Sequence, residues 1–423
     1  MSNRFAVRTL GPCRFESPLQ GAYTVNDDAG ILADATVAAC RNCGGKPAES
    51  LELAGPRRRI FFEPAATRAA IVTCGGLCPG LNDVIRAITM VLWYRYDVRE
   101  ILGLRYGYEG LVERYKHQPL ALTPELVEDI HQNGGTILGS SRGPQDPSEM
   151  VAYLVAKGIS ILFAIGGDGT QRGAMTVARE LERRGLPIAV VGVPKTIDND
   201  VSWTDRTFGF ETAVAMSRPA IECAHMEAKG ARNGVGLVKL MGRESGFVAA
   251  YATLASSDVN LVLVPEVPFR LERLLDWLTA RLARKSHAVI LAAEGAGQDL
   301  VASSGTDASG NRRLGDIGEF LKKAIQDHFA KTGTLAAVRY IDPSYTIRSA
   351  PATADDSVFC FQLAGNAVHA AMTGRTAMVV ALWNGQFVHV PVERAVESRK
   401  SIDPRGALWQ SVLDNTGQPA DLG

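Results

Sequence analysis

The chain has 423 residues, of which 46% are hydrophobic and 21% are charged, and its 45 basic residues balance its 45 acidic residues to a formal net charge of zero. This composition excludes an intrinsically disordered protein, and the lack of a net basic charge excludes a general binder of nucleic acid or of anionic membranes. At roughly 150 residues per domain, the length predicts two or three domains, or one large enzyme with two lobes.

The first 65 residues have no strong hydrophobic periodicity, and we expect them to form an N-terminal extension on the protein surface. Within them, the basic run at residues 57–59 is expected to be solvated or ion-paired, because no aromatic residues or further basic stretch support a nucleic-acid site. Cys40 and Cys43 are expected to be free thiols, because no second Cys or His pair follows at the spacing of a zinc site. The sequence starts without the apolar run of a signal peptide and contains no uncharged apolar run of 18 residues, so we expect a cytoplasmic protein that does not cross a membrane.

From residue 66 onward, short and nearly continuous apolar runs alternate with helical patterns. We predict seven β-strands at these runs, namely 69–73, 159–165, 188–193, 235–240, 261–264, 288–293 and 377–382. Such runs are typical of a parallel sheet that is covered by helices on both faces. The first helical pattern, from Leu81 to Leu92, has apolar residues at helical spacing. The alternation predicts a doubly wound α/β protein in two lobes.

The residues directly after each predicted strand are the first candidates for a binding site, because ligands of α/β proteins bind beyond the carboxyl ends of the strands. Gly75 and Gly76 follow the strand at 69–73 and precede the Leu81 helix. Their backbone N–H groups can approach an anion closely, and the helix dipole adds to the attraction. A tight turn without a ligand would also explain these two glycines.

The second loop, which follows the strand at 159–165, contains Asp168 between Gly167 and Gly169. A carboxylate with glycine on both sides has little to pack against and leaves room for a phosphate with its metal ion. Because Mg²⁺ usually binds one or two carboxylates together with phosphate oxygens, we predict that Asp168 is a Mg²⁺ ligand, directly or through water. An Asp-Gly turn without a ligand is the alternative.

The third loop, after the strand at 188–193, contains Lys195 and Thr196, followed by the two carboxylates Asp198 and Asp200. Two carboxylates at this spacing can divide the roles of general base and structural anchor. The ammonium of Lys195 would keep a neighbouring carboxylate ionised and would neutralise phosphate oxygens. The spacing does not decide which Asp is the base, and the last two residues of the loop could instead cap a turn.

Taken together, these loops resemble those of the 6-phosphofructokinases. The matching motifs run in the family's order from Gly75 to about Val390: Gly75-Gly76, Gly139-Ser140-Ser141-Arg142, Gly166-Gly167-Asp168-Gly169-Thr170, Thr196-Ile197-Asp198-Asn199-Asp200, Met241-Gly242-Arg243, Ala293-Glu294-Gly295 and Tyr345-Thr346-Ile347-Arg348. The resemblance implies a phosphofructokinase-like α/β fold of two lobes, with mainly parallel sheets covered by helices on both faces. It implies a donor-binding lobe made of residues 66–209 and about 347–398, and a sugar-phosphate-binding lobe made of residues 210–346 and about 399–423.

The resemblance also implies an activity in glycolysis, namely Mg²⁺-dependent transfer of a phosphoryl group from ATP to the 1-hydroxyl of fructose 6-phosphate, which gives fructose 1,6-bisphosphate and ADP. Asp198 then resembles the general base, with Lys195 as a second catalytic residue, and Asp168 resembles the carboxylate that positions Mg²⁺. The residues that match the nucleotide site are Gly76, Arg142, Gly143, Gly167, Asp168, Gly169 and Thr170. The residues that match the sugar-phosphate site are Thr196, Ile197, Asp198, Met241, Gly242, Arg243, Glu294, Tyr345 and Arg348.

Two residues bear on whether the donor is ATP or pyrophosphate. Pyrophosphate users of the family carry Asp at the position of Gly169, where its side chain would crowd and repel the α-phosphate of a nucleotide. Lys195, by contrast, resembles the pyrophosphate users, and the combination resembles a branch of ATP enzymes that grew from pyrophosphate-type sequences. Gly169 has more weight, because it decides whether a nucleotide fits, so we expect ATP and keep the pyrophosphate-dependent enzyme as the alternative.

Two further alternatives belong to other groups of proteins. NAD kinases and lipid kinases also carry a Gly-Gly-Asp-Gly-Thr loop, but they would not be expected to supply the motifs at 196–200 and 241–243 in this order. A non-catalytic nucleotide-binding regulator on the same fold would have lost Asp168 or Asp198, and both are present.

The sequence departs from many bacterial relatives at Gly234, where those proteins carry an Arg that reaches the substrate phosphate of a neighbouring subunit. Arg232 and Arg339 are the candidate replacements. The family usually assembles as dimers or tetramers, so we expect a homodimer or homotetramer. The resemblance also implies allosteric regulation, although the effector site of those relatives cannot be traced in this sequence.

Overall fold

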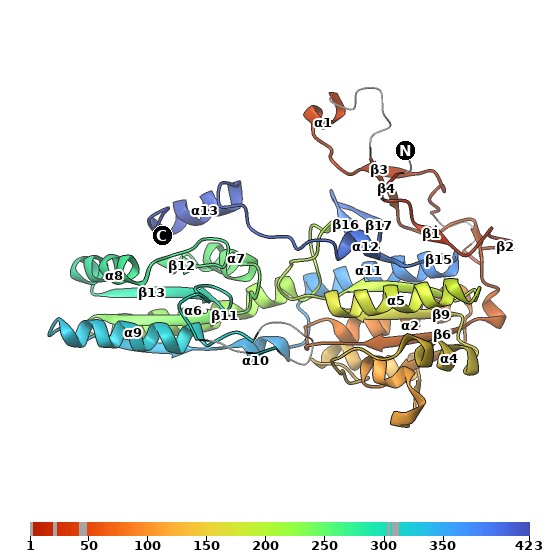
Figure 1. Cartoon of the computed structure of the whole chain (residues 1–423), viewed down its shortest axis with the longest axis horizontal. Coiled ribbons are helices and arrows are strands. Elements are labelled where there is room, and N and C mark those ends of the chain that lie inside the picture. Colours follow the sequence, from red (N-terminus) through yellow and green to blue (C-terminus); the bar gives the residue numbers. More distant parts are fainter. Residues whose placement is uncertain (1–2, 20–22, 42–48, 303–304, 307–312) are drawn as a thin grey trace. The chain divides into compact units, whose positions relative to one another are not determined.

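The structure is a computed structural model of the chain, and it describes residues 3–19, 23–41, 49–302, 305–306 and 313–423. The chain divides into two compact units, whose elements are labelled in Figure 1. Unit 1 consists of Met1–Thr196, Val201–Gly209 and Ala350–Ser398, and unit 2 consists of Ile197–Asp200, Phe210–Ser349 and Arg399–Gly423. The side chains of Cys40 and Cys43, predicted to be free thiols, lie outside the described part of the chain.

Unit 1 contains a nine-stranded sheet in the order β3-β4-β17-β16-β10-β9-β6-β7-β8. The strands are, in chain order, β3 Gly30–Leu32, β4 Ser50–Leu53, β6 Arg68–Thr73, β7 Glu100–Leu104, β8 Leu120–Ala121, β9 Ile161–Gly166, β10 Ala189–Pro194, β16 Met378–Trp383 and β17 Gln386–Pro391. The run from β16 to β7 is parallel, and the strands outside it pair antiparallel. Residues 69–72 of β6 are all fully buried, so both faces of the sheet are covered.

Helices pack on this sheet. α4 (Pro147–Ala156) and α5 (Asp168–Arg183) share one core with apolar side chains of β6, β9 and β10. α2 (Leu81–Tyr96) packs against α11 (Ala354–Met372), which contacts β10 and β16. The other elements of unit 1 are short: the helices α1 Val37–Arg41, α3 Pro124–Val127 and α12 Val392–Ala395, the 3-10 helices η1 Pro64–Ala66, η2 Gly107–Leu111, η3 Glu113–Tyr115 and η4 Ile130–Gln132, and the strand pairs β1 Arg8–Thr9 with β15 Arg375–Thr376 and β2 Phe15–Glu16 with β5 Arg59–Ile60.

Unit 2 contains a four-stranded parallel sheet in the order β12-β13-β11-β14. Its strands are β11 Gly234–Leu240, β12 Leu261–Leu263, β13 His287–Ala293 and β14 Ala337–Ile341. Its helices are α6 Phe210–Gly230, α7 Phe247–Ser256, α8 Leu271–Lys285, α9 Ile317–Lys331, α10 Ser344–Arg348 and α13 Ala407–Thr416. Apolar side chains of α8 and α9 form the core with those of the strands.

All seven strands predicted from the apolar runs are present, and their ends differ from the prediction by no more than two residues. The α/β fold class is therefore confirmed. The pattern does not predict β7, β14 or β17, because Gly103, Arg339 and His389 interrupt their apolar runs. These three strands are recognised by their pairing with neighbouring strands and not by a local apolar run.

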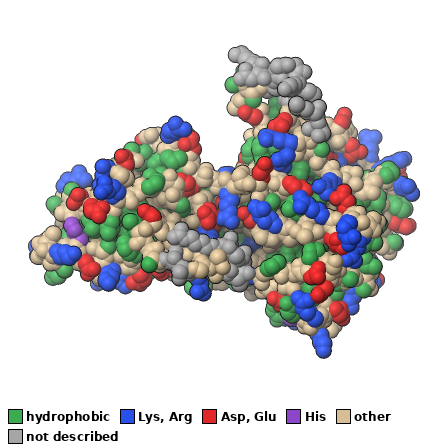
Figure 2. Space-filling view, in the orientation of Figure 1, with side chains coloured by type: hydrophobic (Ala, Val, Ile, Leu, Met, Phe, Trp, Pro, Cys, Tyr) green, Lys and Arg blue, Asp and Glu red, His purple; other side chains and the backbone are tan. Residues whose placement is uncertain are grey.

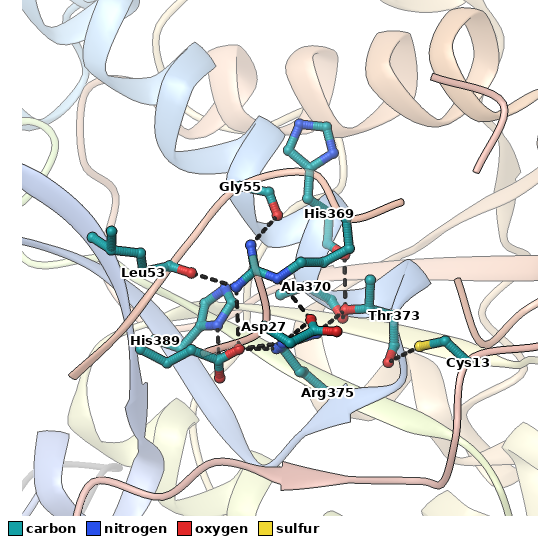
Figure 3. A network of polar contacts seen from close by, with 11 residues as sticks. Cys13, Asp27, Leu53, Gly55, His369, Ala370, Thr373, Arg375 and His389 are labelled. Carbon is teal, nitrogen blue, oxygen red and sulfur yellow. Dashed lines mark hydrogen bonds and ion pairs between the residues drawn. The ribbon is translucent and has the colours of Figure 1, made fainter. Parts of the chain in front are cut away.

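The N-terminal extension is buried more deeply than its weak periodicity predicts. β4 pairs with β3 and with β17, which extends the sheet, and Leu51 is fully buried. Beside it, Glu52 forms ion pairs with Arg57 and Arg375, and Nδ1 of the buried His389 lies 3.4 Å from Oε2 of Glu52 (Figure 3). Arg57 is buried, and its ion pairs agree with the prediction for the basic run. Although burial alone would raise it, hydrogen bonds from His389 and Arg375 hold the pKa of Glu52 well below its ordinary value.

Basic and acidic side chains are interspersed on the face drawn in Figure 2, as the zero net charge leads one to expect. Such a surface has no extended basic field on this face. Among the described residues, no helix is both long enough and apolar enough to span a bilayer.

Candidate active site

The first glycine loop joins β6 to α2 in unit 1. Gly75 and Gly80 have φ values of +85° and +95°, which side chains other than glycine rarely adopt. A Cβ at Gly80 would also lie 2.6 Å from Sγ of Cys360, so this position must be glycine for α2 to pack against α11. The carbonyl oxygen of Gly76 accepts a hydrogen bond of 2.6 Å from Nζ of Lys195. Two of the predicted site residues are thus in direct contact.

The loop that contains Arg142 lies beside this first loop. Oγ of Ser140 donates a hydrogen bond of 2.6 Å to the carbonyl oxygen of Gly75. The guanidinium of Arg142 lies 3.3 Å from the point where a Cβ on Gly76 would stand, and the next residue, Gly143, has a φ of +105°. The structure therefore brings together Gly76 and Arg142, both of which were predicted to bind the nucleotide.

The Gly-Gly-Asp-Gly-Thr motif forms the end of β9 and the first turn of α5. Gly167 is the N-cap residue, and Asp168 begins the helix, where the helix dipole favours a carboxylate. Gly169 is exposed, and a Cβ built on it would meet no atom within 4 Å. Thr170 is buried, and its carbonyl oxygen accepts a hydrogen bond of 2.6 Å from the hydroxyl of Tyr108. The motif thus has a fixed end at Thr170 and open space at Gly169.

Lys195 follows β10 and is only 7% exposed. Its backbone N–H donates a hydrogen bond of 3.0 Å to the carbonyl oxygen of Gly166, and its ammonium reaches Gly76. Thr196 comes next, and its carbonyl oxygen accepts a hydrogen bond of 2.7 Å from the hydroxyl of Thr207. Lys195 therefore connects the ends of β9 and β10 to the first glycine loop.

Asp198 lies in the short stretch of chain that belongs to unit 2. Its Oδ1 atom is buried, and its carbonyl oxygen accepts a hydrogen bond of 3.2 Å from Oγ of Ser245. Burial, together with the carboxylates of Asp200 and Glu294, raises the pKa of Asp198 to about 7, although Arg348 lowers it. A carboxylate with this pKa can take up and release a proton near neutral pH. The neighbouring Ile197 is buried.

Two loops of unit 2 interlock at the ends of β11 and β13. Met241 is fully buried, and Gly242 has a φ of +128°. The backbone N–H of Gly295 donates a hydrogen bond of 2.9 Å to the carbonyl oxygen of Gly242, and a Cβ on Gly295 would lie 1.9 Å from the carbonyl oxygen of Arg243. The close approach of the two backbones explains these glycines without a ligand. It also holds the backbone of Arg243 against that of Gly295.

α10 carries the last two predicted residues, Tyr345 and Arg348. Asp342 accepts a hydrogen bond of 3.0 Å from the first N–H of α10, and Nζ of Lys239 lies 3.0 Å from its carboxylate. Nη2 of Arg348 lies 3.9 Å from Oε1 of Glu294, which places this Arg in the acidic group around the predicted base. Tyr345 is 84% exposed, and no described contact joins it to that group.

Sequence reasoning missed Gln171, which is buried directly after the Gly-Gly-Asp-Gly-Thr motif. Its Nε2 atom lies within hydrogen-bonding distance of the carbonyl oxygens of Ala164, Gly166 and Val193. One signal was present in the sequence, because Gly192 interrupts an apolar strand, and an isolated glycine in a strand indicates a close approach.

Gly234 is explained by its own surroundings. A Cβ there would lie 2.1 Å from the carbonyl oxygen of Ala228, so an Arg fits only if the backbone moves. Of the two candidate replacements, Arg339 forms an exposed ion pair of 3.3 Å with Glu227, and Arg232 is exposed.

The chemistry of Asp168 suits a cation that arrives with oxygens of its own. The described residues include no group of three or more His, Cys, Asp or Glu side chains that could hold a metal ion. Asp168 is the acidic residue in the first turn of α5, next to the open space at Gly169. A single carboxylate of this kind fits Mg²⁺ that is already bound to phosphate oxygens.

The comparisons with known proteins agree on the family. The family model described as Phosphofructokinase matches residues 68–371 of this chain. An ATP-dependent 6-phosphofructokinase of Amycolatopsis methanolica is 50% identical over 440 residues, which cover 99% of this chain and 95% of the relative. Another, of Borreliella burgdorferi, is 46% identical over 435 residues, which cover 99% of this chain and 97% of the relative.

Two solved structures share the fold. The pyrophosphate-dependent phosphofructokinase of Marinobacter aquaeolei has a TM-score of 0.69 at 20% identity, over 84% of this chain and 92% of that chain. The pyrophosphate-dependent phosphofructokinase of Nitrosospira multiformis has a TM-score of 0.70 at 18% identity, over 82% and 91%. On the strength of the family model and the near-full-length relatives, this chain belongs to the phosphofructokinase family.

Proposed function

We propose that this protein is an ATP-dependent 6-phosphofructokinase of glycolysis, which phosphorylates the 1-hydroxyl of fructose 6-phosphate and releases ADP. The observation that carries the proposal is the identity of 46–50%, over 99% of this chain, to relatives that bear this name. In the same proposal, the enzyme acts in the cytoplasm as a homodimer or homotetramer and is regulated allosterically. Light scattering on the purified protein tests the oligomeric state, and a monomer would contradict it.

Unit 2 supplies all the groups for the sugar phosphate except Thr196, which is the last residue before the chain first enters unit 2. Asp198 is the general base, and its pKa of about 7 supports this role, because a base with a pKa near the working pH is both unprotonated and basic enough. The proton of the 1-hydroxyl passes to Asp198 while the hydroxyl oxygen bonds to the terminal phosphorus of ATP and the bond from this phosphorus to the ADP oxygen breaks. Arg243 and Arg348 bind the anion, because guanidinium groups suit phosphate, and Glu294 accepts hydrogen bonds from sugar hydroxyls. The other residues of this proposed site are Thr196, Ile197, Met241, Gly242 and Tyr345.

Unit 1 supplies the groups for the donor. The ammonium of Lys195 and the guanidinium of Arg142 neutralise phosphate charge, which is the main requirement of phosphoryl transfer. The open space at Gly169 supports ATP, because it leaves room for the α-phosphate of a nucleotide. The other residues of this proposed site are Gly76, Gly143, Gly167, Asp168 and Thr170.

Asp168 would hold a Mg²⁺ ion that arrives with the donor. When bound, the ion neutralises negative charge on the phosphate oxygens. The position of Asp168 in the first turn of α5 supports this role, since the carboxylate is half-buried and has glycine on both sides.

A pyrophosphate-dependent enzyme is the second candidate. Lys195 favours it, because the residue resembles the pyrophosphate users and can neutralise the phosphates of either donor. Gly169 argues against it, because pyrophosphate users of the family carry Asp at this position.

Assays with ATP and pyrophosphate side by side test the proposal. Fructose 1,6-bisphosphate formed in the presence of Mg²⁺ is detected through aldolase and a linked dehydrogenase, which works with either donor. Turnover with ATP supports the proposal, turnover with pyrophosphate alone overturns the choice of donor, and no turnover with either overturns the activity. Asp198→Asn tests the base, and near wild-type turnover of this variant would remove Asp198 from that role.

A further inference from the structure

Gln171 lies where three elements of unit 1 meet. It is the fourth residue of α5, and its Nε2 atom lies 3.2 Å and 2.9 Å from the carbonyl oxygens of Ala164 and Gly166 on β9. The same atom lies 3.3 Å from the carbonyl oxygen of Val193 on β10. An amide nitrogen has two hydrogens, so these three carbonyls share two donors. The side chain therefore fastens the first turn of α5 to the ends of two neighbouring strands.

Gly192 makes the room that this carboxamide occupies. Its φ lies outside the left-handed region, so the backbone itself does not require glycine. A Cβ there would lie 2.0 Å from Oε1 of Gln171 and 2.7 Å from Cγ1 of Val379. Since real Cβ atoms do not approach other atoms so closely, any side chain at position 192 displaces the amide of Gln171.

The amide at this position is not explained by stability alone. Its Oε1 atom is buried and has no hydrogen-bond partner among the described residues. A buried oxygen without a partner is unfavourable, and an apolar side chain of the same length would avoid it. What the amide offers in addition is the pair of N–H groups that hold the two strand ends.

We propose that Gln171 is a positioning residue for the phosphoryl donor, which fixes Asp168 and Gly169 relative to Lys195. The proposal rests on the function proposed above for these loops. The carbonyl oxygen of Gly166 accepts hydrogen bonds from the side-chain amide of Gln171 and from the backbone N–H of Lys195. This one atom therefore connects the two loops. Without the amide, the first turn of α5 is free to shift, and a shift of about 1 Å in a positioning element can reduce a rate by about 10²-fold.

The main test variant is Gln171→Met, which keeps the length of the side chain and removes both donors. We expect kcat with ATP to fall about 10- to 100-fold and Mg·ATP to bind about tenfold more weakly. The KM for fructose 6-phosphate should stay within about twofold of wild type, because all the proposed sugar-phosphate residues except Thr196 belong to unit 2.

The matched control is Thr89→Val in the same unit. Thr89 is buried in α2, and its hydroxyl donates a hydrogen bond of 2.9 Å to the carbonyl oxygen of Ile85 in the same helix. This control loses a buried hydrogen bond away from the loops, so it should lower the melting temperature and leave kcat unchanged. If Gln171→Met keeps the kcat and the Mg·ATP affinity of the control, Gln171 is merely structural and the proposal is wrong.

A double-mutant cycle tests the link to Gly192. In the wild-type background, Gly192→Ala displaces the amide and should reproduce the loss of kcat. In a Gln171→Ala background, the amide is already gone, so Gly192→Ala should reduce kcat much less. Independent, multiplicative effects on kcat would overturn the link.

Titration calorimetry separates this proposal from the proposed function. It measures binding of Mg·ATP and of Mg²⁺ with pyrophosphate, and neither measurement depends on the phosphoryl acceptor. If wild type binds one of these donors but does not phosphorylate fructose 6-phosphate, the proposed function fails, and weaker donor binding by Gln171→Met still supports the positioning role. If wild type binds neither donor, both proposals fail.

Discussion

Replacing Gly169 by Asp places a carboxylate next to the proposed nucleotide site without disturbing the fold. Gly169 is the second residue of α5 and is exposed, and a Cβ there meets no atom within 4 Å. An acidic residue in the first turn of a helix is favoured by about 0.3–1 kcal/mol, and glycine is a poor helix former. We therefore expect the melting temperature of Gly169→Asp to equal or exceed that of wild type.

The new charge should act on the ligand instead. Two like charges about 4 Å apart repel each other by about 1 kcal/mol in water and by about 4 kcal/mol at the effective dielectric constant near a protein surface. Because Gly169 is exposed, the lower end of this range applies, and about 1–2 kcal/mol corresponds to a loss of about 5- to 30-fold in kcat/KM for Mg·ATP.

The assay couples ADP formation to NADH oxidation at saturating fructose 6-phosphate while Mg·ATP is varied. Gly169→Asn is the matched control, because Asn has the size of Asp without its charge, and Gly169→Ala adds only a Cβ in open space. We expect the Ala variant to behave as wild type and the Asp variant to recover partly at high salt, where charges are screened. The reasoning is refuted if the Asp and Asn variants have the same kcat/KM for Mg·ATP.

Asp198→Asn is expected to lower kcat by about 10²- to 10⁴-fold, because it removes the proposed base. It should not lower the melting temperature, because it relieves repulsion among carboxylates. A loss of kcat that follows only from unfolding would contradict this prediction. In wild type, kcat/KM for fructose 6-phosphate should fall about tenfold per pH unit below about 7, where Asp198 becomes protonated, and Asp200→Asn should move this fall to lower pH. A profile that stays flat from about pH 5 to about pH 8 would rule this out. Glu52→Gln should reduce the free energy of unfolding at neutral pH by up to about 3 kcal/mol, measured in urea, because it leaves two buried arginines with the exposed Asp27 as their remaining carboxylate partner. The pKa of Glu52 is lowered on folding, so its contribution to stability is present above its ordinary pKa of 4.5 and is lost as the pH falls below that value. The unfolding free energies of wild type and variant should therefore become equal in acid. A difference in unfolding free energy that does not change with pH would contradict the ion pairs. Gly234→Ala should lower the unfolding free energy by about 1–3 kcal/mol, because the new Cβ would lie 2.1 Å from the carbonyl oxygen of Ala228 in α6. Arg339→Gln, at an exposed ion pair, should lower it by about 1 kcal/mol or less. Equal stabilities of the two variants would contradict the steric argument.

Much of the fold is predictable because buried parallel strands need apolar side chains on both faces. That requirement leaves a local signal in β6, β9 and β10, and all three lie within two residues of the predicted bounds. β4 has no such signal. It is held by pairing with β17 and by the ion pair between its own Glu52 and Arg375, and both partners lie far away in the chain. Tertiary pairing of this kind is not visible in a local pattern.

The site was predictable to a different degree at each residue. The motifs locate Gly76, Arg142 and Lys195 on separate loops, but only the fold shows that they lie close to one another. The spacing left open which Asp of the third loop is the base, and the raised pKa of Asp198 depends on residues from other parts of unit 2. Several glycines that looked like ligand loops, such as Gly295, are instead explained by close contact between backbones.

The alternation of the two units along the chain has a consequence for synthesis and for proteolysis. The chain passes from one unit to the other five times, so neither unit corresponds to a continuous piece of sequence. During translation, β10 keeps one edge unpaired until β16 at Met378–Trp383 has left the ribosome, and unit 2 still awaits Arg399–Gly423. A nascent chain therefore cannot complete either unit early, and a protease that cuts once cannot release one of them intact.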